Sequence, residues 1–407
     1  SISGKERLLT TLNAKYINRM LSHIAIISLM ALACCTATGL GPYKPFLALV
    51  EICFILCCLI SLISAKSIPK IVLYMLLTPG MFFVLDYFIN DLFHHRESER
   101  NLFAFMAIAG LIPFLTFPRN LNNLLRYMIL FLVTATSLMY SFAIFFFKLP
   151  FGLFDNPHLT SLFTVIIFIL GVYYCLTASK TYELWLAYFL VFNSLLLLFY
   201  LSSWIGFSSL IGSMIIVIIL KNNHHSYVAA LCLSLFISVI LLSVDFSQSG
   251  NNEVESILRL NSYPIADERL VLWGDSWKMQ VESSLQNWIF GHGFGGFREN
   301  FSEYSSFSNA IQFVFPHNFL LEVLYNNGLL GVMSFLAAFT GIIIKLYKNY
   351  RISKDILNIL AIMLVVSLFL FGFLTLPLLS KYNSYSLSFV IGFSLWILKR
   401  QSSTNEY

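Results

Sequence analysis

The chain has 407 residues, of which 58% are hydrophobic and only 11% are charged. A soluble globular protein of this size would need far more charged surface, so the composition excludes that class and predicts an all-α polytopic membrane protein. The formal net charge of +5 implies no nucleic-acid partner, because the basic residues cluster beside apolar runs, where they suit anionic lipid headgroups.

Twelve apolar runs, each long enough to cross about 30 Å of hydrocarbon as a helix, recur along the chain. We expect membrane spans at residues 22–38, 46–64, 69–90, 101–117, 125–147, 159–178, 183–200, 205–220, 226–245, 318–345, 355–378 and 384–398. With the N-terminus in the cytoplasm, most of the 25 lysines and arginines fall in cytoplasmic loops, and an even number of spans then places the C-terminus there as well. No convincing cleavage site follows residues 1–21, so we expect the first helix to be retained.

One loop, residues 246–317, is far longer than an ordinary connection and divides the chain into three parts. Nine of the predicted spans lie in residues 1–245 before it, and three lie in residues 318–407 after it. The charge rule places this loop on the external side of the membrane.

The long loop contains a predicted amphipathic helix. Its apolar residues recur at steps of three or four, as on one helical face: Leu270, Trp273, Trp277, Val281, Leu285 and Trp288. Indole rings favour the headgroup level, so the pattern indicates a helix that lies on the membrane surface. A helix packed on a small core of the loop itself is the alternative.

A glycine-rich turn, GHGFGGF at residues 291–297, follows this helix. No β-strand precedes it and no Lys-Ser or Lys-Thr pair follows it, which excludes a dinucleotide fingerprint and a P-loop. In one interpretation, the glycines only allow the backbone angles that a tight turn requires. Alternatively, Gly293 and Gly295 could let backbone amides approach a phosphate group closely.

Pro316, His317 and Asn318 stand at the start of the tenth apolar run. Asn318 is a good N-cap, so a helix is expected to begin at residue 318 or 319 and to run inward from the outer face. His317 then lies at the positive end of a long helix, where an anion is favoured and an imidazolium is disfavoured. A neutral imidazole beside an anion site is what a general base requires. A histidine hydrogen-bonded to a loop carbonyl is the structural alternative.

Four basic residues accompany His317 in the long loop: Arg259, Arg269, Lys278 and Arg298. Arginine can grip a diphosphate through two parallel hydrogen bonds, so such a cluster beside a helix N-terminus suits a diphosphate group. For Lys278 and Arg298, ordinary solvated charge is the alternative. Acidic residues occur in ESE at 97–99 and EVE at 253–255, but they lie among residues typical of solvent-exposed loops, and we expect no metal site.

Three segments, in this order, resemble the bacterial O-antigen polymerase and O-antigen ligase superfamily: RLVLW at 269–273, NWIFGHGFGGF at 287–297 and PHNFLLEVLYNNGLLG at 316–331. The similarity is sharp over residues 265–331 and only topological elsewhere. It implies a periplasmic loop and a metal-independent, inverting glycosyl transfer at the periplasmic face of the bacterial inner membrane. The implied donor is an undecaprenyl-diphosphate-linked oligosaccharide, and no cofactor is expected.

The resemblance also implies roles for individual residues. His317 matches the family histidine that activates the acceptor hydroxyl, and Arg269 matches an arginine that holds the diphosphate, while Arg298 and Asn318 match less closely. Members often carry a Ser-Arg pair at the outer end of a mid-chain helix, where this chain has Trp204. Either that pair lies elsewhere, or Lys148 or Arg259 supplies the missing cation, or the diphosphate is bound differently.

Polymerase and ligase differ in the acceptor, which is a lipid-linked repeat unit for the polymerase and the lipid A core for the ligase. Glu322, one turn into the predicted helix, and the absent arginine at position 204 are more similar to polymerases, and a polymerase would also meet a chain-length regulator. A twelve-span transporter or flippase is the rival of another class. Such proteins usually carry ionisable residues near the midplane, whereas the functional residues predicted here gather in one external loop.

Overall fold

The computed structural model describes residues 123–149, 156–201, 203–221, 266–293, 296–307, 315–375 and 381–402. Within these ranges the protein is helical and contains no strand, which confirms the all-α class. Five predicted spans, at 22–38, 46–64, 69–90, 101–117 and 226–245, lie outside the described residues. The total of twelve spans therefore stays a prediction.

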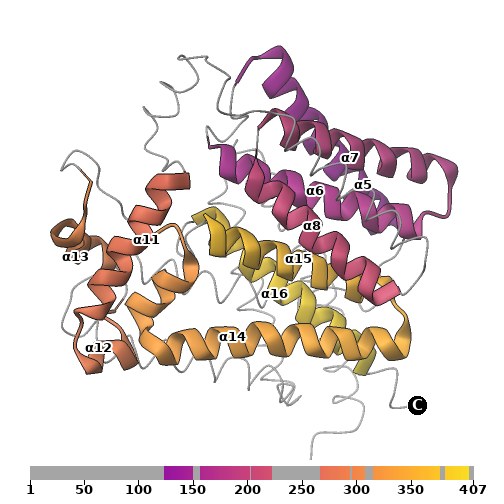
Figure 1. The fold of residues 1–407 in the computed structure, drawn as a ribbon. Helices are drawn as coiled ribbons and strands as arrows, with labels where there is room; N and C mark the ends of the chain where they lie inside the picture. The colour runs from indigo at the N-terminus through magenta and orange to yellow at the C-terminus, as the bar shows by residue number, and fades with distance from the viewer. Residues whose placement is uncertain are drawn as a thin grey trace, which may run out of the picture.

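Apolar helices occupy the positions of the other seven predicted spans (Figure 1). They are α5 (Asn123–Ser141), α6 (Pro157–Thr177), α7 (Thr181–Tyr200), α8 (Trp204–Lys221), α14 (Phe319–Ser353), α15 (Ile356–Leu374) and α16 (Lys381–Ser402), with a short π-helix, η2 (Phe142–Phe146), extending α5. Among the described residues, five helices are long and apolar enough to cross a membrane: α5 with η2, α6, α7, α14 and α15. The chain is therefore a membrane protein.

Helix α15 lies at the centre of the membrane bundle. It packs against α6, α8, α14 and α16, and its residues Ile359 and Phe371 are fully buried. Leu162 of α6 and Leu210 of α8 are equally buried and belong to the same apolar cluster. The two ends of α15 are thereby held firmly, and one of them contributes to the site described below.

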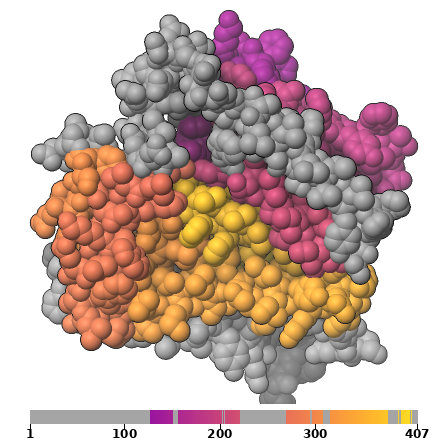
Figure 2. All heavy atoms as spheres, in the orientation of Figure 1, coloured from indigo at the N-terminus to yellow at the C-terminus, as the bar shows by residue number. Residues whose placement is uncertain are grey.

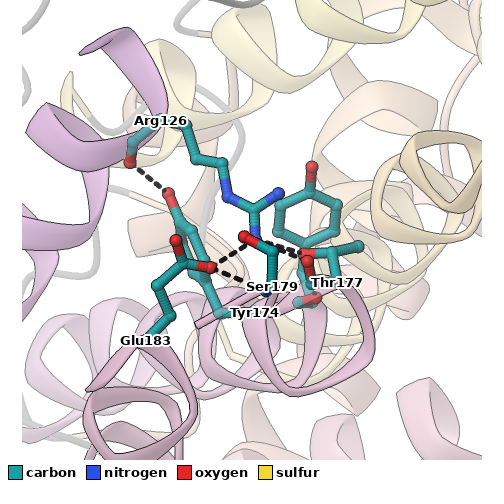
Figure 3. A network of polar contacts seen from close by, with 6 residues as sticks. Arg126, Tyr174, Thr177, Ser179 and Glu183 are labelled. Carbon is teal, nitrogen blue, oxygen red and sulfur yellow. Dashed lines mark hydrogen bonds and ion pairs between the residues drawn. The ribbon is translucent and has the colours of Figure 1, made fainter. Parts of the chain in front are cut away.

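An ion-paired clasp joins α5, α6 and α7 at the end of α6 where that helix terminates (Figure 3). Arg126 Nη2 donates to the carbonyl of Thr177 at 2.6 Å and to Glu183 Oε2 at 2.9 Å. The Tyr174 hydroxyl donates to the carbonyl of Arg126 at 2.7 Å, and the amide of Ser179 donates to Glu183 Oε2 at 3.1 Å. Glu183 is only 1% exposed, so its charge depends on these donors.

Replacement of Glu183 by Ala is expected to lower the free energy of unfolding by about 3 kcal/mol, because it leaves a guanidinium without its counter-charge. Glu183→Gln should cost less, since the amide oxygen still accepts hydrogen bonds. Melting of the detergent-solubilised protein, followed by tryptophan fluorescence, measures the change. Glu303→Ala, at an exposed position on another helix, is the control, and equal melting of both alanine variants would contradict the expectation.

Three shorter helices form the described part of the long loop: α11 (Ala266–Val281), α12 (Leu285–Phe290) and α13 (Gly296–Tyr304). Figure 2 shows them as one continuous surface with the beginning of α14. A small apolar cluster joins α11 and α13 to α14 and includes Leu272, Met279, Phe297, Phe301 and Tyr325, whereas α12 packs against α14. The loop thus has an apolar core of its own, which it shares with α14.

The predicted amphipathic segment is two helices rather than one. The chain leaves the first helix after Val281, and Ser284 accepts a hydrogen bond from the amide of Asn287 to cap the second. Four residues of the predicted stripe, Leu270, Trp277, Val281 and Leu285, are between 49% and 78% exposed. The opposite face of α11, with Leu272 and Met279, packs on the loop's own core, which confirms the second alternative for that face. The contact of the exposed stripe with the membrane surface stays a prediction.

Candidate functional site

Asn318 begins α14, as the sequence predicts. Its side-chain oxygen accepts hydrogen bonds from the amides of Leu320 at 3.0 Å and Leu321 at 3.2 Å, and the helix starts at Phe319. These bonds satisfy two of the amides that a helix start leaves without partners. Asn318 is therefore committed to positioning the helix and, with it, the preceding residue.

His317 is held in an unusual backbone conformation by two other helices. Its φ angle of 51° lies in the left-handed region, which histidine adopts more readily than most residues. Its Nδ1 donates to the carbonyl of Thr375, at the end of α15, over 3.1 Å. The indole of Trp273 donates to the carbonyl of Pro316 at 3.1 Å. Because a carbonyl only accepts, Nδ1 carries the hydrogen and the lone pair of the neutral ring is on Nε2.

Arg269 lies in the first turns of α11 and reaches the start of α6. Its Nη2 donates to Nε2 of His158 at 2.8 Å. No acidic side chain pairs with it in the described part of the chain, and its buried Nε hydrogen has no acceptor there. Burial lowers the pKa of Arg269 to about 10, so the guanidinium remains charged at pH 7.

His158 is a site residue that the sequence reasoning missed. The side chain of Asn156 caps α6 by accepting from the amides of His158 at 2.9 Å and Leu159 at 3.2 Å, and Pro157 occupies the first helical position. The start of α6 thus repeats the design of the start of α14, with an asparagine cap and a histidine beside it. The similarity of NPH at 156–158 to PHN at 316–318 is the signal that could have identified it.

The structure brings His317, Arg269 and His158 together. Burial lowers the pKa of His317 to about 4 and the nearby charge of Arg269 adds to that effect, while the hydrogen bond to Thr375 opposes it. His317 is therefore neutral at pH 7. A charged guanidinium and the positive ends of two helices converge here, and such an arrangement favours an anion. Within the described ranges, no group of three His, Cys, Asp or Glu residues could hold a metal ion.

The glycine turn clamps the loop onto α14. The amides of His292 and Gly293 donate to the carbonyls of Tyr325 and Asn326, each at 2.9 Å. The imidazole of His292 stacks on the ring of Tyr325, with 4.0 Å between the centroids. The amide hydrogen of Gly293 is therefore already donated within the protein, and Gly295 lies outside the described residues.

Gly291 and Gly328 make the close approach of α12 and α14 possible. Both have positive φ angles, and Gly328 interrupts α14 with a non-helical conformation. A Cβ at Gly291 would lie 2.2 Å from the carbonyl oxygen of Asn326, and one at Gly328 would lie 2.3 Å from that of Ile289. Backbone meets backbone at this crossing, so neither position can hold a side chain without displacement.

Gly328→Ala is expected to lower the free energy of unfolding by about 3 kcal/mol, because it adds a backbone clash to a conformation that only glycine adopts readily. Gly341→Ala, in the same helix, places its Cβ in open space and should be neutral or slightly stabilising. Thermal melting of the two variants side by side checks this. Similar melting temperatures would show that the crossing of α12 and α14 tolerates a side chain.

Two of the predicted site residues, Arg298 and Lys148, do not join this cluster. Arg298 on α13 and Lys148 after η2 are exposed and make no polar contact with any residue that the structure describes. Arg259 lies outside the described residues. Position 204 is the first residue of α8.

Comparison with known families gives a match over part of the chain. The sequence model of the O-antigen ligase family matches residues 186–336, a segment that contains Arg269, the glycine turn and His317 but not His158. A search for relatives among curated proteins finds no match. The family connects the chain to O-antigen and lipopolysaccharide biosynthesis and to enzymes of the glycosyltransferase or ligase type that act on lipid-linked oligosaccharides. The match over residues 186–336 supports membership of the O-antigen polymerase and ligase superfamily.

Proposed function

We propose that the protein is an O-antigen polymerase that transfers a glycan from undecaprenyl diphosphate to a lipid-linked repeat unit at the periplasmic face of the bacterial inner membrane. The observation that carries this proposal is the convergence of a neutral histidine, an arginine without an acidic partner among the described residues, and two helix N-termini. Such a site suits a reaction that moves one proton and releases a diphosphate.

His317 is the proposed base and Arg269 the proposed diphosphate ligand. The acceptor hydroxyl oxygen bonds to the anomeric carbon from the face opposite the carrier, while its proton passes to His317 Nε2. The bond from the anomeric carbon to the diphosphate oxygen breaks, and its electron pair leaves with the undecaprenyl diphosphate. Arg269 and the ends of α6 and α14 stabilise the charge that develops on the departing oxygens. The anomeric configuration is inverted, and no step requires a metal ion.

The location follows from the predicted topology rather than from the described helices. Both termini are proposed to lie in the cytoplasm, with the loop at residues 246–317 in the periplasm. His317 would then face the compartment in which the lipid-linked repeat units are exposed. A protein that regulates chain length is a proposed partner of the same compartment.

The second candidate function is that of an O-antigen ligase, which would transfer the glycan to lipid A core. The match to the O-antigen ligase family supports this function and the polymerase function equally. Both functions use the same donor and the same site chemistry, so the acceptor separates them. The resemblance of Glu322 and its surroundings to polymerases is the reason for preferring the polymerase; Glu322 is buried in the first turn of α14.

Deletion of the gene in its native host, followed by electrophoresis and mass analysis of the surface polysaccharide, tests the proposal. A polymerase predicts single repeat units on lipid A core, because ligation continues without polymerisation. A ligase predicts that no glycan is transferred to lipid A core while polymer accumulates on the lipid carrier. An unchanged polysaccharide would refute both functions.

The pH dependence of glycan transfer should reflect the pKa of His317, the proposed base. The protonated ring has no lone pair, so activity is lost as the pH falls through the pKa of His317 in the free enzyme, which is about 4. We expect kcat/KM to stay near its maximum down to about pH 5.5 and then to fall, approaching a tenfold loss per unit below about pH 4. An acid limb centred near the ordinary histidine value of about 6.5 would show that His317 is not the base, or not buried as described.

A further inference from the structure

We infer, on the basis of the proposed function, that His158 is a positioning residue that holds Arg269 toward the donor diphosphate without cancelling its charge. The contact between Arg269 Nη2 and His158 Nε2 measures 2.8 Å. A guanidinium can only donate hydrogen bonds, so the imidazole must accept this one through the lone pair on Nε2. His158 is therefore neutral in this contact, and the full positive charge stays on Arg269.

A second arginine in the same protein shows the alternative way of holding a guanidinium. Arg126 pairs with the carboxylate of Glu183 at 2.9 Å and stabilises three helices (Figure 3). Such a carboxylate neutralises the arginine and would compete with an incoming anion. Arg269 instead has a neutral acceptor, His158, and no acidic side chain pairs with it among the described residues. It is oriented by a hydrogen bond, as Arg126 is, but no carboxylate among those residues neutralises its charge.

The position of His158 makes it a firm anchor. It lies in the first turn of α6, whose start is fixed by the Asn156 cap and by Pro157, and α6 packs against the central helix α15. Arg269, by contrast, comes from the long loop. The hydrogen bond therefore ties a loop arginine to the rigid membrane bundle, and positioning of this kind lowers the cost of binding a ligand.

His158 and His317 take different parts in the same site. His317 donates from Nδ1 to Thr375, so its lone pair is on Nε2. The Nε2 lone pair of His158 is used by Arg269 and cannot also accept a proton from an acceptor hydroxyl. We assign the proton transfer to His317 and the orientation of the diphosphate ligand to His158.

Three substitutions at position 158 test this assignment by changing the group that accepts the hydrogen bond from Arg269. His158→Gln keeps a neutral acceptor, His158→Leu removes it, and His158→Glu replaces it with a charged one. Binding of undecaprenyl diphosphate to the detergent-solubilised full chain is measured for each, together with kcat and donor KM. We expect Kd and KM within about threefold of wild type for Gln, and about 10- to 100-fold higher for Leu and for Glu, with kcat changed far less.

Several outcomes would overturn the positioning role. The role would be wrong if the Leu variant bound undecaprenyl diphosphate as tightly as wild type, or if the Glu variant bound it as tightly as the Gln variant. It would also be wrong if the wild-type protein did not bind this lipid, or if the substitutions lowered kcat without raising Kd and donor KM. If the Leu variant does not fold, the comparison of Gln with Glu decides alone, with melting temperature as the folding check. The binding of undecaprenyl diphosphate is measured without glycan transfer, so the two proposals can fail separately. A wild-type protein that binds the lipid but transfers no glycan would refute the polymerase proposal, and the comparison of the variants at position 158 would remain valid.

Discussion

His317→Ala is expected to insert and fold normally and to lose glycan transfer, with a rate about 10²- to 10⁴-fold lower than wild type. The substitution removes the proposed acceptor of the hydroxyl proton, while Asn318 still caps α14. Complementation of a deletion strain measures the effect as loss of long-chain polysaccharide. The transfer rate of purified protein measures it directly.

A second variant separates proton transfer from structure. His317→Asn retains a residue that tolerates the positive φ of 51°, and its amide group can still donate to a carbonyl such as that of Thr375, but it cannot act as a base. It should melt close to wild type and transfer as poorly as the alanine variant. Normal long-chain polysaccharide in cells that carry either variant would remove His317 from the mechanism.

Arg269→Ala should reduce kcat/KM by about 10²- to 10³-fold, and Arg269→Lys should recover only a small part of that loss. The guanidinium can donate to His158 from Nη2 and to a diphosphate from its other nitrogens at the same time, because its donors form a rigid fork. The lysine ammonium is a compact charge on a flexible stem and cannot keep both contacts in one geometry. Donor KM and kcat measured in detergent or in proteoliposomes distinguish the two variants.

Lys278→Ala is the matched control, since Lys278 lies on the same helix and its exposed side chain makes no polar contact with the described residues. It should change transfer less than about twofold. A lysine at position 269 that keeps more than half of the wild-type rate would mean that a point charge is enough. The forked grip on the diphosphate, and with it the role of His158, would then be wrong.

Local patterns in the sequence were sufficient for the elements of this fold. Apolar runs located the helices α5 to α8 and α14 to α16, because the length and hydrophobicity of a run suffice to predict a membrane helix. The Asn318 cap was predictable for the same reason, since a cap depends on the residues that immediately follow it. His317 and Arg269 could be nominated from their residue types and from a family resemblance.

The apolar stripe of the loop shows where a local pattern is insufficient. Leu270, Trp277 and Val281 form the more regular stripe, yet they are exposed, and Leu272 and Met279 on another face enter the core. Periodicity shows that a helix has an apolar face but not which neighbour covers it. A break at Ser284 then turns α12 toward α14, where Gly291 and Gly328 allow the two backbones to touch.

The sequence by itself determined that this is a helical membrane protein with a histidine at the start of a long helix. Only the tertiary structure decided what surrounds that histidine. Arg269 meets a partner 111 positions away in His158, and His317 meets the carbonyl of Thr375 58 positions away. Contacts at such separations depend on how the helices pack, and no local propensity or periodicity encodes them.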